Sequence, residues 1–175
     1  MGLLGRVLLA AGFVVLSAIG SAFPVIWTKS IVNGGVPKII RDSSGSFYQV
    51  TPVGTLYGRE LVVTKYNALG TAAWSTTLSE NSFSGNQFSV RGLALTATSL
   101  VIVAHERTVG GAGSFVSSRL YGVNLANGSN SFLSTSVMEY APPAATPTQI
   151  AILLRNTSTN DTSVAFFDTT FSVIN

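Results

Sequence analysis

The chain has 175 residues, enough for one domain with a sizeable core. Only 10% of its residues are charged and 46% are hydrophobic, a composition that favours an exported β protein over a cytosolic helical enzyme. The formal charge of +3 comes from ten scattered Lys and Arg residues, so nucleic-acid binding, which needs clustered positive charge, has no support. Because the chain has no cysteine, disulfides, thiol catalysis and zinc-thiolate sites are excluded.

Residues 1–22 have the pattern of a signal peptide or a membrane anchor. A short positive start with Arg6 precedes an apolar run, and small residues before Phe23 offer a cleavage site. Retention as an anchor is the alternative, because the uncharged stretch continues to Thr28, about the ~20 residues that cross a bilayer. Pro24 argues against such a helix. In both cases we expect residues 23–175 to be extracellular or at the cell surface, with membrane contact only through residues 1–22 if they are retained.

From residue 31 onward, short apolar runs alternate with turn residues, which predicts β-strands joined by hairpins. We expect strands at 36–41, 47–53, 61–66 and 72–78. Turns at 42–45 and 67–70 separate them, because Asp or Asn bonds the backbone ahead and Gly accepts a positive φ. A second group is expected at 90–96, 100–104, 117–125 and 131–135. Its run LVIVA at 100–104 indicates a strand buried on both faces, and Asn127-Gly128 predicts a tight turn.

The third group of strands follows a Pro-rich connector at residues 140–147, which cannot be a central strand. Residues 150–154 predict another strand of the buried type, residues 156–162 a polar turn, and residues 163–168 the paired strand. The segment from Phe171 to Ile174 then resembles the start of a further strand.

The three groups repeat a common plan. VVTKYNALGTAAWSTTL at 62–78 and LYGVNLANGSNSF at 120–132 both contain a strand, an Asn, a Gly turn and a second strand with an aromatic residue. Taking Trp27, Trp74, Phe132 and Phe171 as equivalent gives a spacing of roughly 40 to 60 residues, the length of one four-stranded propeller blade.

These two stretches resemble the blade repeats of bacterial secreted β-propeller proteins, including the quinoprotein-like repeat. The resemblance implies a propeller-type scaffold. Asn67 and Asn124 stand where the quinoprotein repeat usually carries Asp, so what it implies is the scaffold without a bound cofactor.

The predicted fold is therefore all-β: a β-propeller-like array of about three four-stranded blades, after a half-unit around Trp27. A β-sandwich is the alternative. Closed propellers need about four to eight blades, so an open array of this size exposes sheet edges. Either the chain belongs to a longer protein, or it self-associates through exposed strand edges, including donation of the Trp27 strand, or the repeats wrap into a sandwich.

No residue pattern predicts a catalytic, cofactor-binding or metal site. His105 is the single histidine and has no nearby nucleophile motif, so a structural or surface role is expected. The Gly-rich run at 110–113 lacks the Lys of a phosphate loop, and the polar run at 156–161 has too few acids for calcium. A glycosidase-like pair would need carboxylates to converge in the fold. The candidates are Asp42, Glu60, Glu80, Glu106, Glu139, Asp161 and Asp168.

The predicted function is that of a secreted or surface-exposed, non-catalytic β-repeat protein serving as a binding or structural scaffold. The alternative is a subunit of an extracellular filament or surface layer assembled by strand exchange. Another protein or a glycan is a possible partner, because Phe47-Tyr48 and Phe166-Phe167 each place one ring on either face of a strand. Asn127, Asn156 and Asn160 lie in glycosylation sequons.

Overall fold

The structure is a computed structural model that describes residues 36–54, 60–78, 87–108, 114–136, 138–172 and 174. The described residues contain twelve strands and no helix, arranged as three antiparallel sheets of four strands each. No helix in these ranges is long and apolar enough to span a membrane. The predicted leader at 1–22, the half-unit around Trp27, the Gly-rich run at 110–113 and Glu80 lie outside the described residues.

The first sheet contains β1 (Lys38–Arg41), β2 (Phe47–Val53), β3 (Glu60–Tyr66) and β4 (Ala72–Leu78), paired in chain order. Its two described turns form as expected. Asp42 and Asn67 each accept backbone hydrogen bonds on a side-chain oxygen, and Gly45 (φ +89°) and Gly70 (φ +82°) take the left-handed conformation. Pro52 lies past the β1–β2 ladder, which ends at Val50, so its missing N–H costs no bond to β1.

The second sheet contains β5 (Gln87–Leu95), β6 (Ser99–Arg107), β7 (Phe115–Asn124) and β8 (Asn130–Ser136), again in chain order. Every residue of β6 between Ser99 and Arg107 is buried. The prediction that residues 100–104 are buried on both faces is therefore confirmed.

The third sheet contains β9 (Glu139–Tyr140), β10 (Ala144–Ala145), β11 (Gln149–Arg155) and β12 (Thr162–Asp168). The short strand β10 lies inside the predicted connector and β9 overlaps its first residue, Tyr140; the two strands pair with opposite ends of β11. Two expectations are wrong here. β11 is buried on one face only, since Leu153 is 45% exposed. Phe171, expected in a strand as the counterpart of Trp74, lies instead in a turn at φ +67°.

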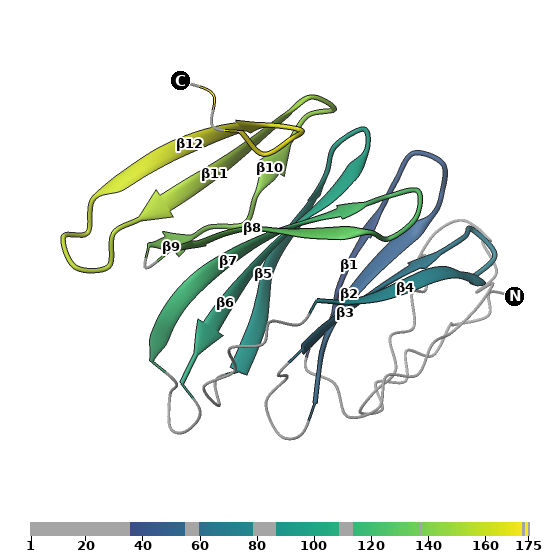
Figure 1. The fold of residues 1–175 in the computed structure, drawn as a ribbon, viewed down its shortest axis with the longest axis horizontal. Coiled ribbons are helices and arrows are strands. Elements are labelled where there is room, and N and C mark those ends of the chain that lie inside the picture. The colour runs from purple at the N-terminus through teal and green to yellow at the C-terminus, as the bar shows by residue number, and fades with distance from the viewer. Residues whose placement is uncertain are drawn as a thin grey trace, which may run out of the picture.

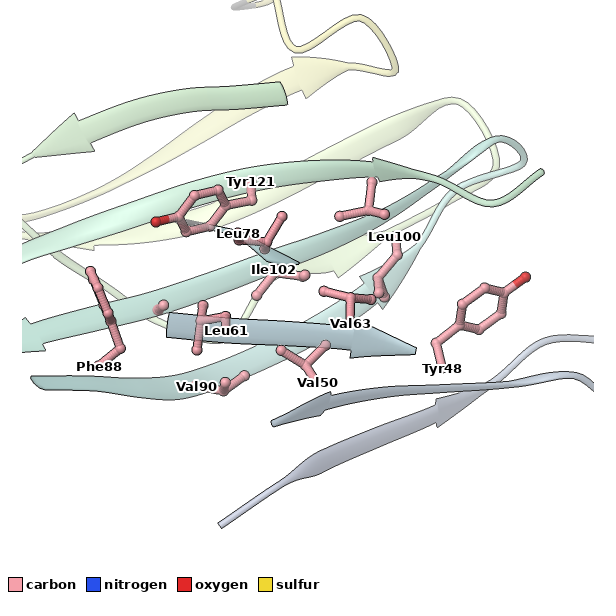
Figure 2. Close-up of a cluster of buried hydrophobic side chains, with 12 residues drawn as sticks. Tyr48, Val50, Leu61, Val63, Leu78, Phe88, Val90, Leu100, Ile102 and Tyr121 are labelled. Carbon is pink, nitrogen blue, oxygen red and sulfur yellow. The ribbon is translucent and has the colours of Figure 1, made fainter. Parts of the chain in front are cut away.

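The three sheets lie side by side, with the second between the other two (Figure 1). β1 and β2 contact β5, and β5 contacts β10, so β1, β5 and β10 follow one another across the three sheets. One apolar cluster fills the space between the first two sheets, with side chains from both (Figure 2). A second cluster joins the second sheet to the third. Each junction removes apolar surface from water, which is the main stabilising contribution.

The repeat is confirmed at the level of turns and strands. At the ends of β3, β7 and β12, Asn67, Asn124 and Asp168 each receive a backbone bond from the residue two positions ahead. Gly70, Gly128 and Phe171 hold the positive-φ position of these turns. Trp74 and Phe132 are both the third residue after the residue that closes the turn, but their cross-strand partners are not equivalent: Trp74 pairs with Lys65, two residues before Asn67, and Phe132 pairs with Tyr121, three residues before Asn124. Phe171 corresponds to Gly70.

A second repeated turn joins β5 to β6 in the second sheet and β10 to β11 in the third. Thr96 N–H donates to Ser99 O (2.9 Å) and Thr146 N–H to Gln149 O (2.8 Å). In both turns the threonine hydroxyl accepts the closing residue's N–H at 3.0 Å. This repeat could not be recognised from the sequence, because neither turn contains Gly or Asn.

Candidate interaction surface

Each sheet presents the same strand positions to the sheet that follows it. We call these positions the outgoing face. In β2, β6 and β11 they are the second and fourth residues after the residue that closes the preceding turn, and in β3, β7 and β12 the residues opposite them. The outgoing face contains Tyr48, Val50, Val63 and Lys65 in the first sheet, Val101, Val103, Leu120 and Gly122 in the second, and Ala151, Leu153, Val164 and Phe166 in the third.

The incoming face is the opposite side of each sheet. In β2, β6 and β11 it consists of the first, third and fifth residues after the closing residue: Phe47, Gln49 and Thr51 in the first sheet, Leu100, Ile102 and Ala104 in the second, and Ile150, Ile152 and Leu154 in the third. Outgoing residues of the first sheet pack on incoming residues of the second, and outgoing residues of the second pack on incoming residues of the third.

A series of hydrogen bonds, which we call the belt, links all three sheets at the end where the turns after β3, β5, β7 and β10 lie. Leu125 O accepts from Lys65 Nζ (2.9 Å) and from Trp74 Nε1 (3.3 Å), both in the first sheet. Leu125 N–H donates to Thr98 O within the second sheet, and Ala97 N–H donates to Pro147 O of the third. The belt therefore links the turns of successive sheets through backbone groups that would otherwise lack partners.

Trp74 also sits directly against the turn of the second sheet. A Cβ on Gly128 would lie 2.8 Å from Trp74 Cε3, so only glycine permits this approach. The indole packs on Tyr48 as well, with ring centroids 6.1 Å apart. Lys65 Nζ lies 5.4 Å from the centre of the Tyr48 ring, a cation–π contact. We call the contact of Trp74 and Lys65 with residues 125–128 the clasp.

An ion pair is buried at the opposite end of β6, on the side facing the first sheet. Arg119 Nη2 lies 2.7 Å from Glu106 Oε2, which also accepts from Ser117 Oγ at 2.8 Å. The guanidinium lies 5.3 Å from the centre of the Phe88 ring. Burial raises the pKa of Tyr121, two residues away from Arg119, to about 12. Glu106 therefore has a structural partner and is not a free acid.

His105 is fully buried on the side facing the third sheet. Its Nε2 lies 2.9 Å from Tyr140 O, and since a carbonyl only accepts, this nitrogen carries the proton. Nδ1 has no hydrogen-bond partner and lies 3.9 Å from Glu139 Oε1. Burial holds the pKa of His105 below its usual value; Arg91 and Arg107 act in the same direction, while the bond to Tyr140 and the Glu139 carboxylate oppose it.

The neighbourhood of His105 joins three strands of two sheets. Tyr140 N–H donates to Ser118 Oγ at 2.8 Å, so β9 is bonded to both β6 and β7. Arg155 Nη1 lies 3.8 Å from Glu139 Oε2. A structural role for His105 is what this geometry supports. The approach of Glu139 to His105 could not be predicted from the sequence, because β9 borders a stretch expected to be a connector and was not expected to be a strand.

The other carboxylates expected as catalytic candidates do not converge. Asp42 and Asp168 hold turns. The hydrogen bonds from Ser44, Tyr48 and Ser46 outweigh burial and lower the pKa of Asp42, and the Thr170 hydroxyl, followed by Ser172 N–H, lowers that of Asp168. Glu60 and Asp161 are exposed. Within the described ranges, no three His, Asp or Glu side chains come together in a way that could hold a metal ion.

The aromatic residues expected as binders differ in exposure, and the sequon asparagines lie in turns. Tyr48 is buried and donates its hydroxyl to Asp42, and burial together with that carboxylate raises its phenol pKa above the ordinary value. Phe167 packs on the second core cluster, while Phe166 is 49% exposed. All three sequon asparagines, Asn127, Asn156 and Asn160, lie in turns, the first and last of them exposed.

The outgoing face of the third sheet has no sheet against it among the described residues. Leu153 is 45%, Val164 53% and Phe166 49% exposed. The backbone N–H of Ile174, which is 39% exposed, donates to Phe166 O and so places this residue beside β12. We call Ala151, Leu153, Val164, Phe166 and Ile174 the open face. A clustered apolar surface of this kind is typical of interaction sites.

Comparison with known proteins finds no protein-family model that matches the chain and no significant match among curated proteins.

Proposed function

We propose that this chain is a non-catalytic structural scaffold of the propeller-blade type, which extends its stack of sheets by binding a further β-sheet at the open face. The observation that carries the proposal is the equivalence of the three outgoing faces. The two positions held by Leu153 and Val164 are exposed on the third sheet, whereas their equivalents are buried at both internal junctions: Val50 and Val63 in the first sheet, Val103 and Leu120 in the second. The order of contacts between β1, β5 and β10 supports a radial arrangement of the sheets over two packed layers.

The proposal also places the scaffold outside the cytoplasm, at the cell surface or in the extracellular medium. Its support is the pattern of residues 1–22 and the low content of charged residues, 10% of the chain. A retained leader would anchor the scaffold to the membrane, and a cleaved one would release it.

Fractionation of expressing cells tests both parts. For this experiment the chain is expressed with a C-terminal tag, and the cell extract is separated by size to find the mass of the complex that contains it. We expect the chain outside the cytoplasm, in a complex larger than one copy. Replacing two open-face residues, Val164→Ser with Phe166→Ser, should release smaller species, whereas the control Leu69→Ser, which removes an apolar residue exposed on a turn of the first sheet, should not. A cytoplasmic location, or a complex indifferent to the open-face variant, would refute the proposal.

The edge of β12 supports a second candidate, assembly by strand exchange. Among the described strands, β12 pairs with β11 alone, and on its other side Phe166 O accepts from Ile174 N–H. An edge of this kind can pair with a strand of another copy and form a filament or surface layer. That candidate predicts polymers that lengthen with concentration; a closed complex of constant size would count against it.

A further inference from the structure

The Asn-X-Ser/Thr sequons are the sequence motifs that the proposed scaffold leaves without a role. Such a motif can accept a glycan where it lies on a surface loop of an exported protein. Asn127 lies in the turn between β7 and β8, and Asn156 and Asn160 lie in the turn between β11 and β12. All three meet the structural condition of a surface loop, and their exposure and hydrogen bonds distinguish between them.

The side-chain amides of Asn127 and Asn160 use only their oxygen atoms. Asn127 Oδ1 accepts from Ser129 N–H at 2.9 Å, and Asn160 Oδ1 accepts from Arg155 Nη2 at 2.8 Å. Neither Nδ2 donates a hydrogen bond to another described residue, and both asparagines are exposed. Because a glycan is attached at the amide nitrogen, it would break none of these bonds.

Asn156 is held more closely than the other two asparagines. Its Oδ1 accepts from Ser158 N–H at 2.9 Å and from Thr159 N–H at 3.3 Å, and the residue is half-buried. Its backbone O also accepts from Asn160 N–H at 2.8 Å, so the two asparagines lie together in one tight turn. We therefore expect this turn to carry one glycan, on the more exposed Asn160.

The hydroxyl residues of the two favoured sequons are also accessible. Ser129 and Thr162 are both exposed. The bond that holds the Asn127 side chain comes from the backbone N–H of Ser129, so the hydroxyl is not needed for the turn. Asn124 forms the same kind of turn with Ala126 N–H, but it lacks a hydroxyl residue two positions ahead. It therefore serves as an internal control for the motif.

We propose that Asn127 and Asn160 carry N-linked glycans. The inference rests on the proposed location outside the cytoplasm, because glycans of this kind are attached to exported chains. The donor is an oligosaccharide linked to a lipid diphosphate. The asparagine Nδ2 forms a bond to the anomeric carbon of the sugar while the bond from that carbon to the diphosphate oxygen breaks. The lipid diphosphate leaves with the electron pair, and the amide loses one proton.

The two sites lie at opposite ends of the strands. The turn that contains Asn127 lies at the belt, where Leu125 N–H donates to Thr98 O. The turn that contains Asn160 follows the far end of β11, whose first residues lie beside Pro147 of the belt (Figure 1). Neither site belongs to an outgoing or an incoming face. Glycans at these positions would cover strand ends and leave the open face accessible to a further sheet.

Mass spectrometry of the full chain, purified with a C-terminal tag from the organism that encodes it, tests the two sites. Trypsin cuts after Arg119 and Arg155, so the peptide 120–155 contains Asn127 and the next peptide contains Asn160. We expect the mass of an oligosaccharide on both peptides. Fragmentation of the first peptide should leave Asn124 unmodified.

Three variants remove a sequon hydroxyl without changing an asparagine. Ser129→Ala should abolish the added mass on the first peptide, and Thr162→Ala should abolish it on the second. Ser158→Ala removes the hydroxyl of the Asn156 sequon and is the matched control, because it should change neither peptide. Circular dichroism checks that each variant is folded.

Unmodified peptides from a chain found outside the cytoplasm would overturn the glycans and leave the proposed location intact. Unmodified peptides from a cytoplasmic chain would overturn both. Added mass that survives Ser129→Ala and Thr162→Ala, or that depends on Ser158, would lie on other atoms and overturn the assignment. Glycans on both peptides of a chain whose complex is indifferent to Val164→Ser with Phe166→Ser would support the assignment and refute the scaffold.

Discussion

Replacing Gly128 by Ala tests the clasp between the first two sheets. Gly128 has φ +74°, and a Cβ there would lie 2.8 and 2.9 Å from two ring atoms of Trp74. The ring cannot move away freely, because its Nε1 donates to Leu125 O and its face packs near Tyr48. The substitution therefore introduces both backbone strain and overpacking.

The two costs can be separated. An L residue in the left-handed conformation costs about 1 kcal/mol, and overpacking against a held ring costs about 1–3 kcal/mol more, so we expect Gly128→Ala to lower the free energy of unfolding by about 2–4 kcal/mol. Urea denaturation followed by circular dichroism measures this value. Gly45→Ala is the matched control. Gly45 has φ +89°, but its Cβ would meet the flexible end of Arg41 at 3.2 Å, so only the strain of about 1 kcal/mol is expected.

A double-mutant cycle then isolates the contact with the ring. In a Trp74→Ala background the Cβ at position 128 has room, so Gly128→Ala should cost only the backbone strain. We expect a coupling of about 1–3 kcal/mol between the two positions. Equal costs for Gly128→Ala and Gly45→Ala, or a coupling near zero, would show that Trp74 does not pack on this turn.

Three further predictions concern the junctions. Gly92→Ala on β5 places a Cβ 2.7 Å from the Pro142 backbone, so we expect a loss of about 2–3 kcal/mol in urea unfolding, and a neutral variant would contradict this contact. His105 has a folded-state pKa below its usual value of 6.5, so unfolding takes up a proton as the pH falls below about 6.5; stability should drop there, and His105→Gln should flatten that part of the stability profile between pH 7 and about 5. A profile unchanged by the substitution would exclude His105 as the cause. Glu106→Leu leaves Arg119 buried without its carboxylate partner and should cost about 3–5 kcal/mol, most of which Arg119→Met restores in the double variant; additive losses would mean that the ion pair is not the source.

The parts of the fold that sequence predicted well are those set by local chemistry. The strands at 47–53 and 72–78 match β2 and β4 in full. They are bounded by Asp or Asn residues whose side chains bond the backbone ahead, and by glycines at positive φ. Each of these turns is specified within five residues, so no knowledge of the rest of the chain is needed.

The turns that sequence reasoning missed use less specific residues. Thr96 and Thr146 close equivalent turns with their hydroxyl groups, yet threonine is also common within strands. Phe171 holds a positive φ that its residue type disfavours, and Asp168 compensates by bonding Thr170 and Ser172 N–H groups. Aligning Phe171 with Trp74 by aromatic character was therefore wrong, whereas aligning Asp168 with Asn67 matches the backbone.

The open face was beyond local prediction. Residues 150–154 are as apolar as residues 100–104, and the two runs occupy equivalent strands. An apolar run indicates that both faces of a strand are suited to burial. Whether both faces are buried depends on which other parts of the chain pack against them. In β6 a sheet covers each face, while in β11 only the side of Ile150 and Ile152 is covered. The approach of Glu139 to His105 could not be predicted for the same reason, because the two residues are far apart in the sequence.

The placement of polar contacts explains how sheets with such uniform apolar faces keep one alignment. Apolar burial is non-directional, so the branched side chains alone would tolerate one sheet sliding along another. At one end of the middle sheet, the belt through Leu125 and Ala97 ties it to both neighbours. At the other end, His105 bonds β9 of the third sheet. Sliding by one residue would break bonds at both ends and leave buried groups unpaired, which costs more than the apolar contacts could recover. We infer that these few polar contacts fix the alignment, while the apolar positions supply most of the stability.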